Sequence, residues 1–191
     1  MLKFKQGITP HYFQTDAKKA LYERFKSDKN ARPIIEMETG SGKSIVLVDL
    51  SIDAINWKRR ILHLTHSETL VRQNSQALID CTDSPVNLTI CCAGLKSYDT
   101  TGQVVFASIQ TLVKRLKDLR AFDLVIIDEC HLISVYDDTS YQKTLTDLLI
   151  KNPNCRVVGL TATPYRLKQG WLFWAVVKRD DIKPTPPFST D

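Results

Sequence analysis

Six consecutive residues in the first quarter of the chain have the chemistry needed to hold a phosphate chain. The segment lies between an apolar stretch and a stretch with helical spacing, and it reads Thr39-Gly40-Ser41-Gly42-Lys43-Ser44. Glycines let successive backbone N–H groups turn toward one anion, and the N-terminus of the following helix adds partial positive charge. Lys43 can neutralise the β and γ phosphates, and the Ser44 hydroxyl can bind a bridging Mg²⁺. We therefore expect residues 39–44 to bind a nucleoside triphosphate, although such a turn can also be only a tight connection before a helix.

Two adjacent carboxylates, Asp128 and Glu129, follow a second apolar stretch, residues 124–127. A buried carboxylate is costly, but at the carboxyl end of a parallel strand it faces the crevice where ligands bind. There Asp128 can hold Mg²⁺ through its water shell, and Glu129 can orient and deprotonate an attacking water. The pair favours hydrolysis over transfer to an acceptor, although an acidic turn after a strand can simply begin a helix. His131 lies beside the pair and is a candidate sensor, whereas a lone histidine is more often packed or exposed.

The elements that must position these residues alternate along the chain. Helical apolar spacing occurs at residues 11–25, 43–56, 68–80, 110–119 and 139–150. Continuous apolar stretches, which we interpret as buried strands, occur at residues 34–37, 61–64, 88–92, 104–107, 124–127 and 156–160. Strands without polar alternation are buried on both faces, as in a parallel sheet covered by helices on each side. The pattern predicts an α/β, doubly wound fold with a mostly parallel sheet.

Length and composition fit one such domain. The chain has 191 residues, 43% of them apolar and 25% charged, and a formal net charge of +5 that permits a polyanionic partner. Five cysteines without a CxxC pair fit neither a disulfide framework nor a zinc site, and no apolar run approaches the ~20 residues of a membrane span. We expect a cytoplasmic (intracellular) protein without a secretory signal. Its domain is expected to cover residues 1–168, followed by an irregular, proline-containing tail at residues 169–191.

Three motifs, in this order and spacing, resemble those of the superfamily-two helicases and translocases, in particular the DEAD/DEAH (DECH-type) members. They are Gly40-Ser41-Gly42-Lys43-Ser44, Asp128-Glu129-Cys130-His131 and Thr161-Ala162-Thr163-Pro164. The resemblance implies an N-terminal RecA-like lobe that uses ATP and Mg²⁺, in which Gln14 recognises the adenine base. It also implies that Thr161 and Thr163, with His131, couple the hydrolysis site to a nucleic-acid groove. Without the resemblance, residues 161–164 would be interpreted only as a strand end turned by a proline.

Two further segments resemble the nucleic-acid-binding motifs of the same family. They contribute the candidate contacts Thr65, His66, Ser108, Gln110 and Thr111. In the family, such segments follow sheet strands and hold the sugar–phosphate backbone without reading its sequence. The three candidates at residues 108–111 could equally cap the helix expected at residues 110–119. The pattern at residues 165–167 is common among restriction motors and DNA-repair helicases, which favours DNA over RNA.

Three cations lie on expected helices near these segments: Arg72, Lys114 and Arg115. Charged residues on helices usually form a solvated face, and we prefer that interpretation to nucleic-acid binding.

The resemblance also implies a second lobe. Family members hydrolyse ATP between two RecA-like lobes, the second of which supplies arginines to the γ-phosphate. We therefore expect the ATP-binding lobe of a nucleic-acid-dependent ATPase, weakly active or inactive alone, that works with a second lobe in cis or in trans. One alternative is a module that binds nucleotide or nucleic acid without hydrolysis, or a subunit of a larger assembly. Another is a phosphotransferase for a small acceptor, for which no acceptor pocket can be identified in the sequence.

Overall fold

A seven-stranded sheet forms the centre of the computed structural model, which describes residues 1–132, 140–163, 165–166 and 170–171. Its strands are parallel except β4, which pairs antiparallel with β3 at one edge. From edge to edge the order is β1 (Ile34–Glu36), β7 (Arg156–Thr161), β6 (Leu124–Asp128), β2 (Ile61–Thr65), β5 (Val104–Ser108), β3 (Leu88–Cys92) and β4 (Ser97–Tyr98). A separate antiparallel pair consists of β8 (Tyr165–Arg166) and β9 (Gly170–Trp171). Apart from β9, the tail expected at residues 169–191 lies outside the described residues.

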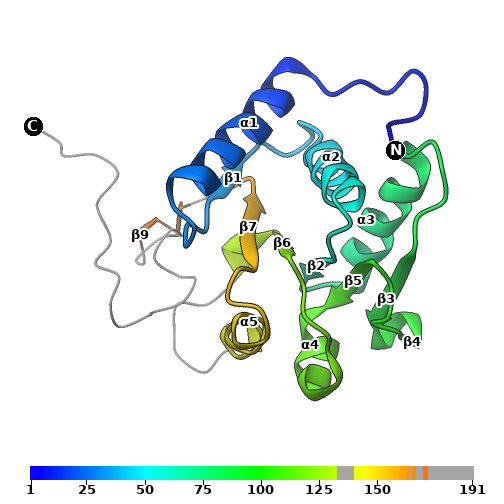
Figure 1. Cartoon of the computed structure of the whole chain (residues 1–191), viewed down its shortest axis with the longest axis vertical. Helices are drawn as coiled ribbons and strands as arrows, with labels where there is room; N and C mark the ends of the chain where they lie inside the picture. Colours follow the sequence, from blue (N-terminus) through cyan, green and yellow to red (C-terminus); the bar gives the residue numbers. More distant parts are fainter. Residues whose placement is uncertain (133–139, 164, 167–169, 172–191) are drawn as a thin grey trace, which may run out of the picture.

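Helices cover both faces of this sheet (Figure 1). One face carries α1 (Tyr12–Ser27), α2 (Lys43–Asn56) and α3 (Glu68–Cys81). The other carries α4 (Ile109–Leu112), the 3₁₀ helix η2 (Val113–Asp118) and α5 (Ser140–Lys151). Two short 3₁₀ turns, η1 (Ala93–Leu95) and η3 (Cys130–Leu132), follow β3 and β6. The predicted doubly wound α/β fold is confirmed.

The continuous apolar strands arise because each strand feeds two cores. In β6, Val125 and Ile127 pack in the core beneath α4 and α5, whereas Ile126 packs in the core beneath α1, α2 and α3. Successive side chains of a strand point to opposite faces, so burial on both faces requires apolar residues at every position. Within the described ranges, every helix is too short or too polar to span a bilayer, and the five cysteines carry free thiols.

The prediction of one regular helix at residues 110–119 is wrong. The chain makes four residues of α-helix and then a 3₁₀ helix, with Arg115 at the non-helical angles φ −125° and ψ 15°. Ser108 occupies the N-cap position of α4, but its hydroxyl does not bond a helix N–H. Two of the residues from 110 to 113 are β-branched, which lowers helix propensity, and Gln110, at the start of α4, is exposed. The missing cap and weak propensity explain why the helix does not continue regularly.

One histidine is fully enclosed in the core. His63 in β2 is 1% exposed, stacks on Phe106 with ring centroids 4.2 Å apart, and has Nε2 2.9 Å from the Ser51 hydroxyl. Burial lowers the pKa of His63 to about 3, because the charged imidazolium loses its hydration there. This histidine is therefore neutral in the folded protein at neutral pH.

Candidate active site and nucleic-acid edge

The phosphate-loop segment connects the end of β1 to the start of α2. Gly40 and Gly42 have φ angles of 83° and 81°, which residues with a Cβ adopt only at a cost in conformational free energy. The Ser41 amide and hydroxyl both donate to the Glu38 carbonyl, at 3.1 Å and 2.6 Å. The helix then begins at Lys43, so its first N–H groups lie at the loop. Residues 39–44 thus form a turn that ends at a helix N-terminus, as an anion site requires.

Gln14 fastens this loop to α1. Its side chain is 2% exposed; Nε2 donates to the carbonyls of Ser41 at 3.0 Å and Gly42 at 3.3 Å, and Oε1 accepts from the His11 amide at 2.8 Å. A Cβ on Gly42 would lie 2.5 Å from Gln14 Nε2, so the loop needs glycine there for close approach as well as for its φ angle. Adenine recognition by Gln14, which the resemblance implies, would require this amide to exchange its bonds to the loop for bonds to the base.

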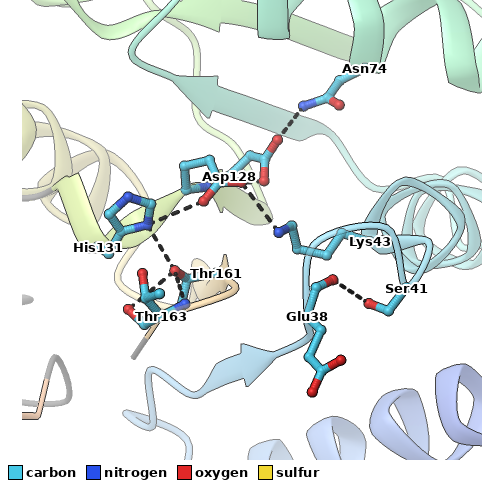
Figure 2. Close-up of polar contacts among 9 residues, drawn as sticks. Glu38, Ser41, Lys43, Asn74, Asp128, His131, Thr161 and Thr163 are labelled. Atoms are coloured by element: carbon cyan, nitrogen blue, oxygen red, sulfur yellow. Dashed lines mark hydrogen bonds and ion pairs between the residues drawn. The ribbon is translucent and has the colours of Figure 1, made fainter. Parts of the chain in front are cut away.

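A chain of polar contacts joins the loop to the strand ends beside it (Figure 2). Lys43 Nζ lies 3.3 Å from Glu129 Oε1, and His131 Nδ1 lies 3.2 Å from Glu129 Oε2. His131 Nδ1 also lies 2.8 Å from the hydroxyl of Thr161 at the end of β7, and this hydroxyl accepts from the Thr163 amide at 3.1 Å. Because β7 lies between β1 and β6, it places Thr161 between the loop and the acidic pair. The structure therefore brings Lys43, Glu129, His131, Thr161 and the backbone of Thr163 together.

Glu129 has an unusual backbone conformation. Its φ angle is +51°, in the left-handed region, which costs a residue other than glycine roughly 1–2 kcal/mol. Residues held in such conformations concentrate at functional sites, where the surrounding structure compensates for the strain. Here the turn after β6 places the Glu129 carboxylate within ion-pair distance of Lys43.

Asp128 is the buried member of the acidic pair. It is 7% exposed, and its two oxygens accept from Asn74 Nδ2 at 2.7 Å and from the Glu129 amide at 2.9 Å. Burial raises the pKa of Asp128 above its usual value, the Asn74 hydrogen bond lowers it, and the negative charge of Glu129 raises it. Binding of a cation at this carboxylate would oppose the effect of burial.

Asn74 is a site residue that the sequence analysis missed. It lies in α3, 54 positions before Asp128, and it is 4% exposed. Val71, Ser75 and Leu78 are buried on the same helix, at the spacing of one helical face. The signal in the sequence is therefore an amide at a position of α3 where the spacing calls for an apolar side chain.

The residues present fit Mg²⁺ bound together with a nucleotide. Ser44 is the second residue of α2 and is exposed, whereas Asp128 ends β6 and is buried. Among the described residues, no three histidine, cysteine or acidic side chains cluster as a metal cage. Mg²⁺ is usually held by one or two carboxylates and by substrate phosphates, so a single carboxylate beside a phosphate loop is an appropriate donor set. Ser44 and Asp128 are the residues that would hold it.

The five candidate nucleic-acid contacts lie at or just after the carboxyl ends of two further strands, β2 and β5. Thr65 and Ser108 end the paired strands β2 and β5, opposite each other in register. Gln110 Nε2 donates to the His66 carbonyl at 3.0 Å, which fastens the start of α4 to the end of β2. Thr111 lies one helical turn from Ser108 and accepts its hydroxyl hydrogen at 2.9 Å. The structure thus gathers both segments at one place.

Three of these candidates are buried and use their hydroxyls internally. Thr65 donates to the Ser67 carbonyl at 3.0 Å, and Thr111 accepts from the Ala93 amide at 2.9 Å as well as from Ser108. Capping of α4 by the Ser108 side chain, the alternative interpretation, is not seen. The side chains available to a ligand are therefore those of Gln110, which is exposed, and His66, which is partly exposed.

Comparison with known proteins identifies related chains. The chain is 26% identical over 168 residues to a Type I restriction enzyme EcoAI endonuclease subunit of Escherichia coli, covering 83% of this chain and 20% of that protein. It is 27% identical over 143 residues to a putative ATP-dependent DNA helicase, fml2, of Schizosaccharomyces pombe, covering 69% and 18%. The chain thus spans about a fifth of the length of these curated relatives.

A similar solved structure and a matching family model agree with these sequence relationships. The crystal structure of the UvsW helicase from bacteriophage T4 superposes with a TM-score of 0.64 at 23% identity, over 82% of this chain and 54% of that one. The family model described as "Type III restriction enzyme, res subunit" (ResIII) matches residues 7–166. This chain belongs to the ResIII family, and it has the fold of the N-terminal RecA-like, ATP-binding lobe of superfamily-two helicases.

Proposed function

We propose that this chain is the ATP-binding lobe of a nucleic-acid-dependent helicase or translocase that couples ATP hydrolysis to movement along a strand, with DNA favoured over RNA. The observation that carries the proposal is the 3.3 Å contact between Lys43 Nζ and Glu129 Oε1 at the mouth of the phosphate loop. A lysine that binds phosphates and a carboxylate that activates water must share one small space for triphosphate hydrolysis. The name of the Schizosaccharomyces pombe relative, a DNA helicase, supports DNA as the nucleic acid.

Hydrolysis would begin with an exchange of partners at Lys43. The loop N–H groups at the start of α2 bind the phosphates of ATP, and the Lys43 ammonium leaves Glu129 for the β and γ phosphate oxygens. Glu129 is then free to accept a proton from water as the water oxygen bonds the γ-phosphorus and the bond to the β–γ bridging oxygen breaks, releasing ADP. Bound Mg²⁺ would neutralise charge on the phosphate oxygens, with Ser44 and Asp128 as its protein partners.

Coupling between the hydrolysis site and the nucleic-acid groove would pass through the strand ends that lie between them. Glu129 contacts His131, and His131 contacts Thr161, whose hydroxyl holds the backbone of residue 163. A change at Glu129 on nucleotide binding therefore reaches the end of β7 through two direct contacts. On the other side, Asn74 connects Asp128 to α3, the helix that follows Thr65 and His66.

Full activity would require a second RecA-like lobe, in cis or in trans. That lobe would supply an arginine to the charge that develops on the γ-phosphate, a contribution worth roughly 10³–10⁵ in rate where it has been measured. We expect this chain alone to bind ATP with Mg²⁺ but to hydrolyse it weakly. In the cell we expect it to act among intracellular nucleic acids.

The test compares ATP hydrolysis by this chain and by a longer natural product containing a second lobe, each with and without single-stranded DNA, duplex DNA or RNA. Stimulation in the longer form supports the motor function, and stimulation by DNA but not RNA supports the substrate preference. Lys43→Ala should abolish nucleotide binding, whereas Glu129→Gln should retain ATP and slow its cleavage by about 10²–10⁴-fold. Normal turnover by Glu129→Gln would remove Glu129 from its role. Tight nucleic-acid binding without hydrolysis in either form would instead identify a binding module.

A further inference from the structure

A hollow of about 460 Å³ is lined by residues of β4, α4 and η2. Strand β4 forms the edge of the sheet farthest from β1 (Figure 1). The residues of its lining that matter here are Tyr98, Gln110, Thr111, Lys114, Arg115 and Asp118. Its volume falls in the range of pockets that hold small ligands or parts of larger ones. The phosphate-loop residues 39–44 and the acidic pair 128–129 do not line it, so the proposed ATP chemistry leaves it unexplained.

Arg115 lies over the ring of Tyr98 in this hollow, and we call the pair the Tyr98–Arg115 layer. The Arg115 guanidinium carbon lies 4.3 Å from the centroid of the Tyr98 ring, and Tyr98 is 47% exposed. Contact with a ring orients a guanidinium group while leaving its N–H donors able to bind an anion. Aromatic rings and arginine planes are also the groups on which proteins stack unpaired bases.

The charge of the hollow is positive. Lys114 and Arg115 line it with one carboxylate, Asp118, and among the described residues neither cation has an ion-pair partner. Arg72, interpreted with them as part of a solvated face, is instead 3.4 Å from Glu68 of its own helix. Of the three cations, Lys114 and Arg115 are therefore the two whose charge no described carboxylate pairs.

The hollow is continuous with the strand ends that carry the candidate nucleic-acid contacts. Gln110 and Thr111 belong to both, and Gln110 also holds the His66 carbonyl at the end of β2. A strand that follows the ends of β2 and β5 would therefore meet the hollow next. Its phosphates would approach Lys114 and Arg115, and an unpaired base could reach Tyr98.

We propose that Tyr98, Lys114 and Arg115 form a binding subsite for a single nucleic-acid strand, in which the two cations hold a backbone phosphate and the Tyr98–Arg115 layer stacks a base. This inference rests on the proposed function, because it requires nucleic acid to cross the carboxyl ends of β2 and β5. The bound strand is single, since a base inside a duplex has no free face to stack on the layer.

The test measures the affinity of fluorescent oligonucleotides by anisotropy, over a series of salt concentrations, with the full chain. Tyr98→Ala should weaken single-strand binding roughly 5- to 150-fold, the range measured for loss of one base–aromatic stack, and Tyr98→Phe should retain affinity. Arg115→Ala should weaken binding and reduce the slope of log affinity against log salt by about 0.7, as expected for one lost phosphate contact. Asp118→Asn removes the opposing charge and should tighten binding.

Arg24→Ala is the matched control, because Arg24 is an exposed cation on α1 whose loss changes the net charge equally. Each variant should keep the melting temperature and the affinity for a fluorescent ATP analogue. If Tyr98→Ala and Arg115→Ala bind single strands as Arg24→Ala does, the subsite is refuted while the proposed function stands. If the unaltered chain binds no nucleic acid, the subsite is refuted, and the proposed function is decided separately by nucleic-acid stimulation of ATP hydrolysis in the longer form. Equal displacement of the strand by a poly-glutamate peptide would refute a nucleic-acid subsite in favour of a general polyanion surface.

Discussion

The side-chain amide of Asn74 donates a 2.7 Å hydrogen bond to the carboxylate of Asp128, from a helix on one face of the sheet to the end of a central strand. Both groups are buried, so neither can exchange this partner for bulk water. The contact makes Asn74 a positioning residue for the carboxylate that we propose holds Mg²⁺. It also connects that carboxylate to the helix that begins after Thr65 and His66.

Replacement of Asn74 by alanine should weaken Mg²⁺-dependent ATP binding. The hydrogen bond from Asn74 lowers the pKa of Asp128, so its loss should raise that pKa further and leave the buried carboxylate with one donor fewer. Loss of a group that orients a metal ligand typically costs 10–100-fold in metal affinity. We expect an increase of about that size in the Mg²⁺ concentration that half-saturates binding of a fluorescent ATP analogue, and a shift of the acid limit of binding to higher pH. Gln76→Ala, at an exposed position of the same helix, is the control and should change neither quantity.

The two glycines of the phosphate loop should respond differently to alanine. Both have positive φ angles, so either substitution should lower the free energy of unfolding by about 1–2 kcal/mol. At Gly40 a Cβ would meet nothing within 4 Å, whereas at Gly42 it would displace the Gln14 amide from the loop. Gly42→Ala should therefore cost more, by about 0.5–1.5 kcal/mol for each disrupted hydrogen bond, in urea denaturation. Equal losses for the two variants would mean that Gln14 does not stabilise the loop.

Valine variants of Thr161 and Thr163 should differ in their effect, although both residues are expected to couple the hydrolysis site to the nucleic-acid groove. Thr161 contributes its hydroxyl to His131 and to residue 163, whereas Thr163 contributes only backbone atoms to these contacts. Thr161→Val should therefore reduce the change in oligonucleotide affinity that an ATP analogue produces, while Thr163→Val should leave it nearly intact. Thr161→Ser, which restores a hydroxyl, should recover the coupling. The measurement is the ratio of oligonucleotide dissociation constants with and without the analogue. An unchanged ratio in Thr161→Val would exclude the hydroxyl from the coupling.

The sequence predicted the strands and the loop well because their signals are local. The start of α2 at Lys43 follows from glycines before a helical pattern, and the end of β6 at Asp128 follows from an apolar run that stops at a carboxylate. The amide of Asn74 at an apolar position of α3 does not reveal its partner, because that partner depends on the strand order that places β6 next to β2 and on the packing of α3 against β2. Gln14 was assigned to a base by resemblance, and only the folded chain brings its amide to the loop carbonyls. The 3₁₀ helix η2 was not predicted either, because apolar periodicity alone does not register the missing cap and the β-branched residues that weaken the helix.

The buried His63 should make the protein less stable in mild acid. In the unfolded chain its pKa is about 6.5, and burial lowers the pKa to about 3 in the fold, so between these values the unfolded state binds a proton that the folded state does not. This histidine's contribution is fully present above pH 6.5 and is lost as the pH falls toward 3, by at most roughly 1.4 kcal/mol per pH unit. Urea denaturation at pH 7.5, 5.5 and 4.5 should show this slope, and His63→Leu should flatten it even if the variant is less stable at pH 7.5. His11→Gln, at an exposed position, is the control and should keep the slope of the unaltered chain. A slope that His63→Leu leaves unchanged would assign the acid sensitivity to carboxylates such as Asp128 instead.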